Sequence, residues 1–102
     1  MKQLVVFMFV ISLLASCKTI ESYGKCYQET TDKACLQKVV DKINIGADKA
    51  DIKKLLGEPI DSGFDYRYLI DEKGENGCAM GAVFHFDENG KVDQKWLGEI
   101  CE

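Results

Sequence analysis

Apolar residues first recur along this chain with the period of a helix. Within residues 30–43, Leu36, Val39, Val40 and Ile43 fall at i, i+3, i+4 and i+7. This spacing places all four side chains on one face. It therefore predicts an amphipathic helix that packs on a core.

A second and shorter helical pattern covers residues 48–59. Asp48 is expected to cap its start, and Gly57 is expected to end it in the left-handed conformation. A helix of barely two turns is not stable alone in water, so packing on the rest of the domain has to hold it.

Beyond these helices the apolar period changes to two, which is typical of strands. Strands are predicted over residues 64–71, 78–86 and 91–101. The first strand carries an aromatic face expected in the core: Phe64, Tyr66, Tyr68 and Ile70.

The last two strands form a hairpin around an Asn-Gly turn. If Phe86 pairs with Val92, then Ala82 pairs with Trp96, and both apolar sets share the core face. Trp96 is therefore expected in the core. The opposite face is expected to show water a mixture of charges and Leu69, Val83, His85 and Leu97.

Helices that precede strands in this order predict an α+β fold. We expect two N-terminal helices packed on one face of a three-stranded antiparallel sheet.

An almost wholly apolar run covers residues 4–16, between Lys2 and Cys17. It is too short for a helix that spans a bilayer, which takes roughly 20 residues. With its charged start, it fits a cleaved secretory signal. Residues 14–17, Leu-Ala-Ser-Cys, resemble the bacterial lipobox, which implies cleavage before Cys17 and acyl chains on it. The alternative is an ordinary signal peptide that contains a cysteine.

These patterns divide the chain into a signal peptide (1–16), a lipidated tether (17–25) and a folded domain (26–102). Lys18 stands where aspartate would favour retention in the inner membrane. The expected location is therefore the periplasmic face of the outer membrane, with Cys17 anchored by lipid.

The charge balance excludes one class of partner. The chain has 17 acidic and 13 basic residues, a formal net charge of −4, and no basic cluster. This argues against nucleic acid. It also argues against electrostatic docking on anionic lipid, so lipid on Cys17 has to provide the membrane attachment.

Four cysteines remain besides Cys17, and an even number in a small exported domain predicts two disulfides. Of three possible pairings we favour Cys78–Cys101 across the hairpin and Cys26–Cys35 as a local bridge. The first bridge needs a β-bulge to correct the parity of the strand, expected at Gly98. A zinc site is the alternative, but the wide spacings do not suit it.

The sequence offers little for catalysis. His85, the single histidine, is expected to be a solvated strand residue, and no serine or cysteine has an evident base partner. Asp61 and Asp65 are expected to flank a turn. Residues 71–77 lack the oxygen spacing of a calcium loop. We expect no enzyme activity, no metal, no cofactor and no small-molecule substrate.

One family resemblance covers residues 43–97. "INIGADKADIKKLLGEPI" resembles the opening of the SmpA/OmlA (BamE-like) domain, with its short helix ending in Leu-Gly-x-Pro. "DYRYLI" and "AVFHFDENGKVDQ" resemble the aromatic strand and final hairpin of that domain. The resemblance implies a small outer-membrane lipoprotein with an ααβββ fold.

By this resemblance the chain is expected to be a non-enzymatic scaffold that binds another envelope protein. Outer-membrane protein assembly and envelope integrity are the processes implied. Tyr66 and Arg67 are the candidate contact residues, because Tyr and Arg are enriched at binding hot spots. The alternative is a periplasmic inhibitor of a secreted hydrolase, such as a lysozyme or a β-lactamase.

Overall fold

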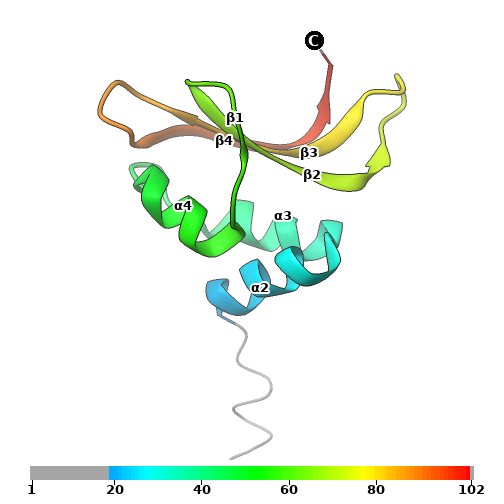
Figure 1. The fold of residues 1–102 in the computed structure, drawn as a ribbon, viewed down its shortest axis with the longest axis horizontal. Coiled ribbons are helices and arrows are strands. Elements are labelled where there is room, and N and C mark those ends of the chain that lie inside the picture. Colours follow the sequence, from blue (N-terminus) through cyan, green and yellow to red (C-terminus); the bar gives the residue numbers. More distant parts are fainter. Residues whose placement is uncertain (1–18, 102) are drawn as a thin grey trace, which may run out of the picture.

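A computed structural model describes residues 19–101 of the chain; the apolar run, Cys17 and its proposed lipid lie outside the described residues. Figure 1 shows three helices followed by a sheet. The elements are α2 (Ile20–Thr30), α3 (Lys33–Lys42), α4 (Lys49–Leu56), β1 (Ile60–Asp61), β2 (Asp65–Lys73), β3 (Ala79–Phe86) and β4 (Val92–Ile100).

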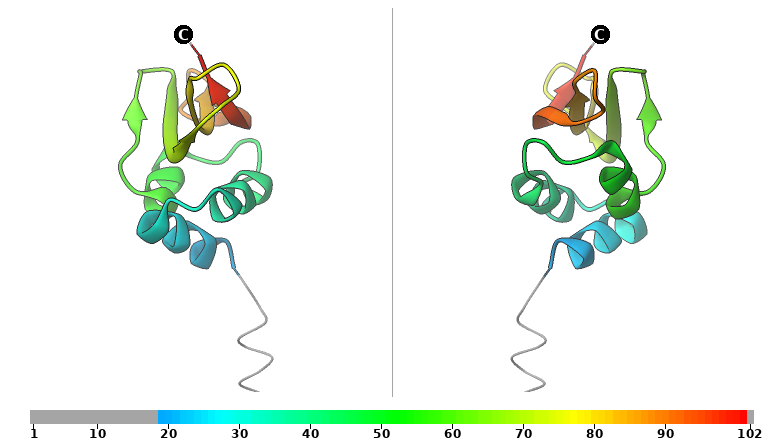
Figure 2. Two further views of the ribbon diagram at one scale, coloured as in Figure 1. Left: turned by 90° about the vertical axis from the view of Figure 1, so that its right-hand side faces the viewer. Right: turned by 90° about the vertical axis from the view of Figure 1, so that its left-hand side faces the viewer.

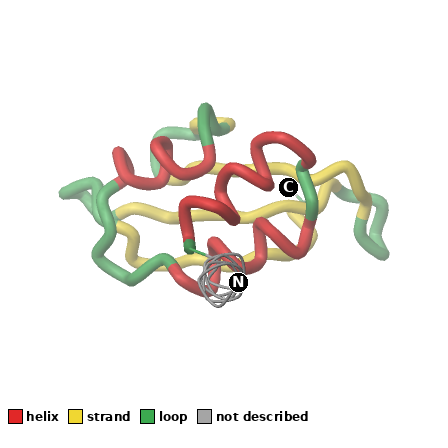
Figure 3. Tube along the Cα trace, turned by 90° about the horizontal axis from the view of Figure 1, so that it is seen from below, coloured by secondary structure: helices red, strands yellow, loops and turns green. Residues whose placement is uncertain are grey.

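The strands form one antiparallel sheet in the order β1-β2-β3-β4. The helices all lie on one face of this sheet, as the views in Figures 2 and 3 show. The predicted α+β class is confirmed. Residues 19–101 contain one helix and one strand more than predicted, because α2 and β1 were not expected.

Helix α2 corrects the prediction of a tether over residues 17–25. The described domain begins at Thr19, whose hydroxyl caps the helix by accepting from the amide of Ser22 at 3.3 Å. Ile20, Tyr23 and Tyr27 of α2 follow the helical period and pack at the core, a pattern that the tether prediction overlooked. Contacts with α3 and α4 hold this segment in place, and Tyr27 reaches the sheet by donating to the carbonyl of Leu69 at 2.6 Å.

The two predicted helices are both present, with shifted ends. Helix α3 begins after Asp32, because Thr31 adopts the left-handed conformation that ends α2. Helix α4 begins after Asp48 and ends before Gly57, whose φ is 87°. Asp48 and Gly57 thus flank this helix as predicted, but no side-chain hydrogen bond from Asp48 caps its start, and Gly57 combines its positive φ with a ψ of −160°.

The core lies between the helices and the inner face of the sheet. Its most deeply buried side chains are Phe84, Leu36, Ile52, Val39 and Val92. Tyr68 is also buried, and its hydroxyl donates to the carbonyl of Gly57 at 2.9 Å. This bond joins the end of α4 to the middle of β2, and burial raises the pKa of the Tyr68 phenol.

The prediction that Phe64 belongs to the core is wrong. Its side chain is 75% exposed, although Tyr66, Tyr68 and Ile70 are buried as expected. The chain turns between β1 and β2 at this point, so Phe64 lies before the first residue of β2. Its side chain therefore does not follow the alternation of buried and outward side chains along that strand.

The predicted register of the hairpin holds only at its first pair. Phe86 does pair with Val92, but His85 then pairs with Gln94, so Asp93 is an extra residue in β4. The bulge is therefore at Asp93 and not at Gly98. From there on every side chain of β4 faces the side opposite to the one predicted.

This early bulge has a direct consequence for Trp96. Trp96 pairs with Val83 instead of Ala82, so its ring lies on the face that the helices do not cover, and it is 42% exposed. Leu97, expected on that face, packs against the core instead. The same shift brings Cys78 and Cys101 together without a second bulge.

Both disulfides of the favoured pairing are present. Cys78–Cys101 joins the start of β3 to the end of β4, and Cys26–Cys35 joins α2 to α3. All four sulfur atoms are used in this way, so they are not available as the thiolate ligands of the alternative zinc site.

Candidate functional site

The uncovered face of the sheet is the main candidate for a binding site. In Figure 1 it is the upper side of the sheet, away from the helices. Side chains of β2, β3 and β4 meet there in rows that run across the strands. One row consists of Arg67, Val83 and Trp96, each paired with the next.

A shallow hollow of about 240 Å³ surrounds this row. Its lining joins apolar, charged and amide side chains from all three long strands: Asp65, Arg67, Val83, His85, Gln94, Trp96, Glu99, Ile100 and Cys101. Apolar surface beside a few polar groups is typical of places where proteins bind one another.

Arg67 is placed for recognition and is held in position. Its Nε lies 3.4 Å from Oδ1 of Asp65, two residues earlier on the same face. The two side chains are 23% and 16% exposed. This ion pair joins two side chains that both line the hollow.

Tyr66, the other candidate contact residue, does not lie on this face. Its ring is only 4% exposed and packs edge-on against Phe86, with 4.7 Å between ring centroids. Lys53 of α4 lies over the same ring at 5.6 Å. The prediction that Tyr66 binds a partner is therefore corrected, because alternation along β2 turns it into the core.

Trp96 is the residue that the sequence analysis missed on this surface. No local signal marked it, because the extra residue Asp93 decides which face of β4 carries Trp96. A Cβ added at Gly98 would meet the indole ring 3.6 Å away, so the ring lies next to the space that the glycine leaves. Trp96 thus offers a broad face to a partner.

His85 and Asp93 form a close pair at the same face. Nδ1 of His85 lies 2.6 Å from Oδ1 of Asp93, the bulged residue, and both side chains are about 40% exposed. Cys101 contributes the one sulfur in the lining of the hollow, and this sulfur is in a disulfide. A thiolate of Cys101 is therefore not available beside this pair.

The loop between β2 and β3 is a second exposed feature. The carboxylate of Glu99 accepts from the backbone amides of Asn76 and Cys78, both at 2.9 Å, and from the side-chain amide of Asn76 at 3.0 Å. The Cys78–Cys101 disulfide holds the base of the loop. The loop is thereby fixed in one conformation.

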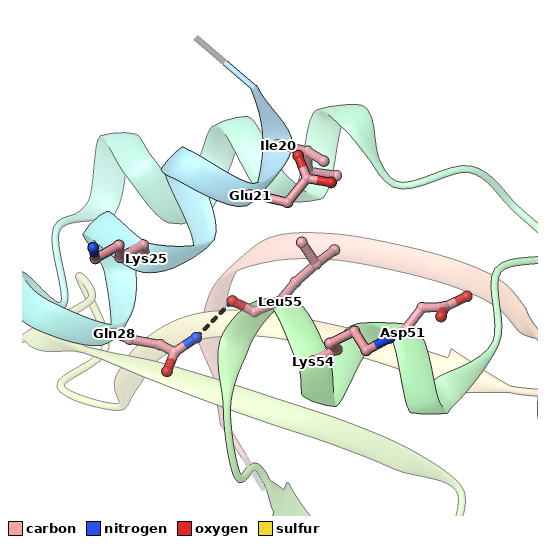
Figure 4. A pocket seen from close by; sticks show the side chains of 7 residues that line it. All are labelled: Ile20, Glu21, Lys25, Gln28, Asp51, Lys54 and Leu55. Atoms are coloured by element: carbon pink, nitrogen blue, oxygen red, sulfur yellow. Dashed lines mark hydrogen bonds between the residues drawn. The ribbon is translucent and has the colours of Figure 1, made fainter.

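A further hollow of about 340 Å³ lies between α2 and α4 (Figure 4). Ile20 and Leu55 form its apolar part, and charged side chains of both signs surround them. Gln28 crosses the gap and donates to the carbonyl of Leu55 at 2.8 Å. This bond and the mixed charges indicate that the hollow is a junction between two helices, and its lining does not form an evident catalytic or ligand-binding site.

The other side chains that could bind a metal ion have structural roles instead. Asp61 accepts from the amide of Gly63 at 2.9 Å, and Asp65 accepts from Ser62, so both aspartates stabilise the turn before β2. Among the described residues, each group that could hold a metal consists of one disulfide and one carboxylate. Sulfurs in a disulfide are poor metal ligands, because the thiolate is the binding form.

No protein-family model, curated protein or solved structure matches this chain. Within residues 19–101, no helix has both the length and the apolar character needed to cross a membrane.

Proposed function

We propose that this chain is a non-enzymatic outer-membrane lipoprotein, anchored through Cys17, that binds another envelope protein with the open face of its sheet. The observation that carries this proposal is the cross-strand row of Arg67, Val83 and Trp96. Tryptophan and arginine are the residues most enriched at binding hot spots. Here they lie on the one face of the sheet that the helices do not cover.

The position of α2 supports the proposed anchor. Thr19 is only two residues after Cys17, and a chain of this length spans at most about 7 Å. Figure 1 shows that α2 starts on the side of the helices away from the sheet. A lipid on Cys17 would hold the helices near the membrane and leave the row of Arg67 and Trp96 facing the periplasm.

The resemblance to the SmpA/OmlA (BamE-like) family remains part of this proposal. The final hairpin, the short helix ending at Gly57 and the lipobox-like residues 14–17 are its basis. A role in outer-membrane protein assembly or envelope integrity follows from the resemblance.

Two measurements test the proposal. Mass spectrometry of the protein from its native host is expected to find a diacylated or triacylated cysteine at Cys17. An unmodified thiol at Cys17 would contradict the proposed lipid anchor. Crosslinking in intact cells is expected to capture one stoichiometric partner.

The surface is tested by comparing variants in the same crosslinking experiment. Trp96→Ala and Arg67→Ala are expected to reduce capture of the partner at least tenfold, because each removes a central contact. Phe64→Ala is the matched control, since Phe64 is exposed but lies outside the row. Equal capture by all three variants would rule out this face.

The fixed loop between β2 and β3 favours one second function, inhibition of a secreted hydrolase. A loop held in one conformation loses little entropy on binding, which is an advantage for an inhibitor. The test replaces residues 71–77 with glycine and serine and measures inhibition of lysozymes and β-lactamases. No inhibition of any of them by the unmodified protein would exclude this alternative.

A further inference from the structure

Two asparagines of this chain precede a glycine, and both lie in the same tripeptide. Residues 75–77 and residues 88–90 each read Glu-Asn-Gly. The first tripeptide lies in the loop between β2 and β3 and the second in the turn between β3 and β4, at opposite ends of the sheet (Figure 1). The backbone nitrogen of a glycine can attack the side-chain amide of a preceding asparagine, because glycine has no side chain that obstructs the approach.

The backbone of the two turns is held in the same way. Gly77 donates to the carbonyl of Gly74 and Gly90 donates to the carbonyl of Asp87, both at 3.0 Å. The two donors have similar positive φ values of 80° and 75°. In each turn one carboxylate oxygen, from Glu99 or from Asp87, accepts from the amide of the asparagine and from the amide that follows the glycine. Neither the tripeptide nor the backbone therefore distinguishes the two asparagines.

The side chains of the two asparagines do differ. Nδ2 of Asn76 donates to Oε1 of Glu99 at 3.0 Å, which fixes this side-chain amide on the carboxylate. Asn89 is exposed, and within residues 19–101 its only hydrogen bond is the one that its backbone amide donates to Asp87. The side-chain amide of Asn89 is therefore free to rotate toward the nitrogen of Gly90, as the reaction between the two groups requires.

We propose that Asn89 is a site of spontaneous deamidation, and that the bond to Glu99 protects Asn76 from the same reaction. The nitrogen of Gly90 attacks Cγ of Asn89 and forms a C–N bond. The bond from Cγ to Nδ2 breaks, and Nδ2 leaves as ammonia with the proton that the Gly90 nitrogen has lost. Water then opens the cyclic succinimide at either carbonyl group, which gives aspartate or isoaspartate.

The product changes the hairpin in two ways. Either form of the residue adds a negative charge directly after Asp87 and Glu88, and like charges at this distance repel one another. Isoaspartate also adds a methylene group to the main chain before Gly90, whose carbonyl accepts from the amide of Lys49 in α4 at 3.1 Å. Deamidation is therefore expected to weaken the contact between the hairpin and α4. It requires neither the lipid nor the partner protein proposed above.

The first test follows both asparagines in the full-length folded protein, kept in mild detergent at a mildly alkaline pH. Mass spectrometry of peptides, digested at acidic pH, measures aspartate and isoaspartate at each position over time. Asn89 is expected to react at least about tenfold faster than Asn76, which is the effect of one hydrogen bond to a charged group. Equal rates, or a faster reaction at Asn76, would overturn the proposal.

The same measurement on the unfolded chain separates the effect of structure from that of sequence. After reduction of the disulfides in guanidinium chloride, Asn76 and Asn89 are expected to react at similar rates, because each lies in a Glu-Asn-Gly tripeptide. If Asn89 kept the same advantage in the unfolded chain, the sequence would cause it and protection by Glu99 would be excluded.

A variant tests the protection directly. Glu99→Ala removes the acceptor of the Asn76 side chain, so Asn76 is expected to react as fast as Asn89, whose own rate should not change. Glu72→Ala is the matched control, since Glu72 is exposed on β2 outside both turns, and it should leave both rates unchanged. Slow deamidation of Asn76 in a folded Glu99→Ala variant, as checked by circular dichroism, would contradict the proposal. If this variant unfolds, the comparison in the unaltered protein decides.

Discussion

Gly24 of α2 lies directly against the backbone carbonyl of Leu55 in α4, and a Cβ at position 24 would collide with that oxygen. This contact lets the two helices approach closely enough for Gln28 to bond the same carbonyl. Glycine inside a helix normally lowers its stability, by about 1 kcal/mol relative to alanine. Here the close approach explains why glycine is present.

Gly24→Ala is therefore expected to destabilise the protein although it improves helix propensity. We expect a loss of about 1–3 kcal/mol, the usual effect of overpacking a tight contact. Urea denaturation followed by circular dichroism measures this change. Lys25→Ala, at an exposed neighbouring position, is the control and should change the unfolding free energy by less than about 0.5 kcal/mol. A stabilised Gly24→Ala variant would contradict the contact.

Glu99→Gln is expected to loosen the loop between β2 and β3. The neutral amide accepts hydrogen bonds with one oxygen only, so it cannot serve all three donors from Asn76 and Cys78. We expect a loss of about 1–3 kcal/mol. The amides of Asn76 and Cys78 should exchange their hydrogens faster, as measured by NMR.

The matched control for this loop is Glu75→Gln, which makes the same chemical change at an exposed position of the same loop. It should leave the exchange of both amides unchanged. Equal acceleration in the two variants would show that Glu99 does not hold the loop.

Stability is expected to fall at alkaline pH because of two buried tyrosines. Burial raises the pKa of Tyr27 and of Tyr68 in the folded protein above the ordinary value of 10.0. The unfolded chain therefore loses these protons first, so the folded state is favoured fully below pH 10 and progressively less above it. Denaturation between pH 8 and 11 measures the slope.

Tyr68→Phe tests the origin of this alkaline effect. It should lower stability at neutral pH by about 1 kcal/mol, because the bond to the Gly57 carbonyl is lost. It should also reduce the decline above pH 10. Tyr23→Phe is the control, since Tyr23 lies on α2 near the surface of the core. An unaltered alkaline decline in Tyr68→Phe would contradict the assignment.

The two disulfides are expected to contribute unequally. Cys78–Cys101 closes a loop with a sequence separation of 23, and Cys26–Cys35 one with a separation of 9. Loop-closure entropy gives about 3.4 kcal/mol for the first and about 2.6 kcal/mol for the second. Thermal unfolding of the two Cys→Ala double variants measures the order. A larger loss from removing Cys26–Cys35 would show that entropy is not the main contribution.

Local patterns were sufficient for much of the fold. The helical period of Leu36, Val39, Val40 and Ile43 predicted α3, because those side chains need one common core. Gly57 marked the end of α4, where its positive φ suits glycine. The alternation around Tyr66 and Tyr68 predicted β2. The even number of cysteines besides Cys17 predicted two bridges.

The candidate site could not be predicted in the same way. Which residues share a face depends on strand parity, and one extra residue, Asp93, reverses that parity for the rest of β4. Trp96 therefore moved from the expected core to the open face. Tyr66, proposed as a contact residue, is buried because the helices cover its face.

The sequence by itself determined the α+β class, two of the helices and the three long strands, because each depends on neighbours close along the chain; it favoured the cysteine pairing that the structure shows. Only the tertiary structure decided that Arg67 and Trp96 lie in one row, on either side of the buried Val83, on the face that the helices leave open. That outcome depends on the single extra residue Asp93 in β4 and on the helices that cover the other face of the sheet. Local periodicity carries no information about such contacts.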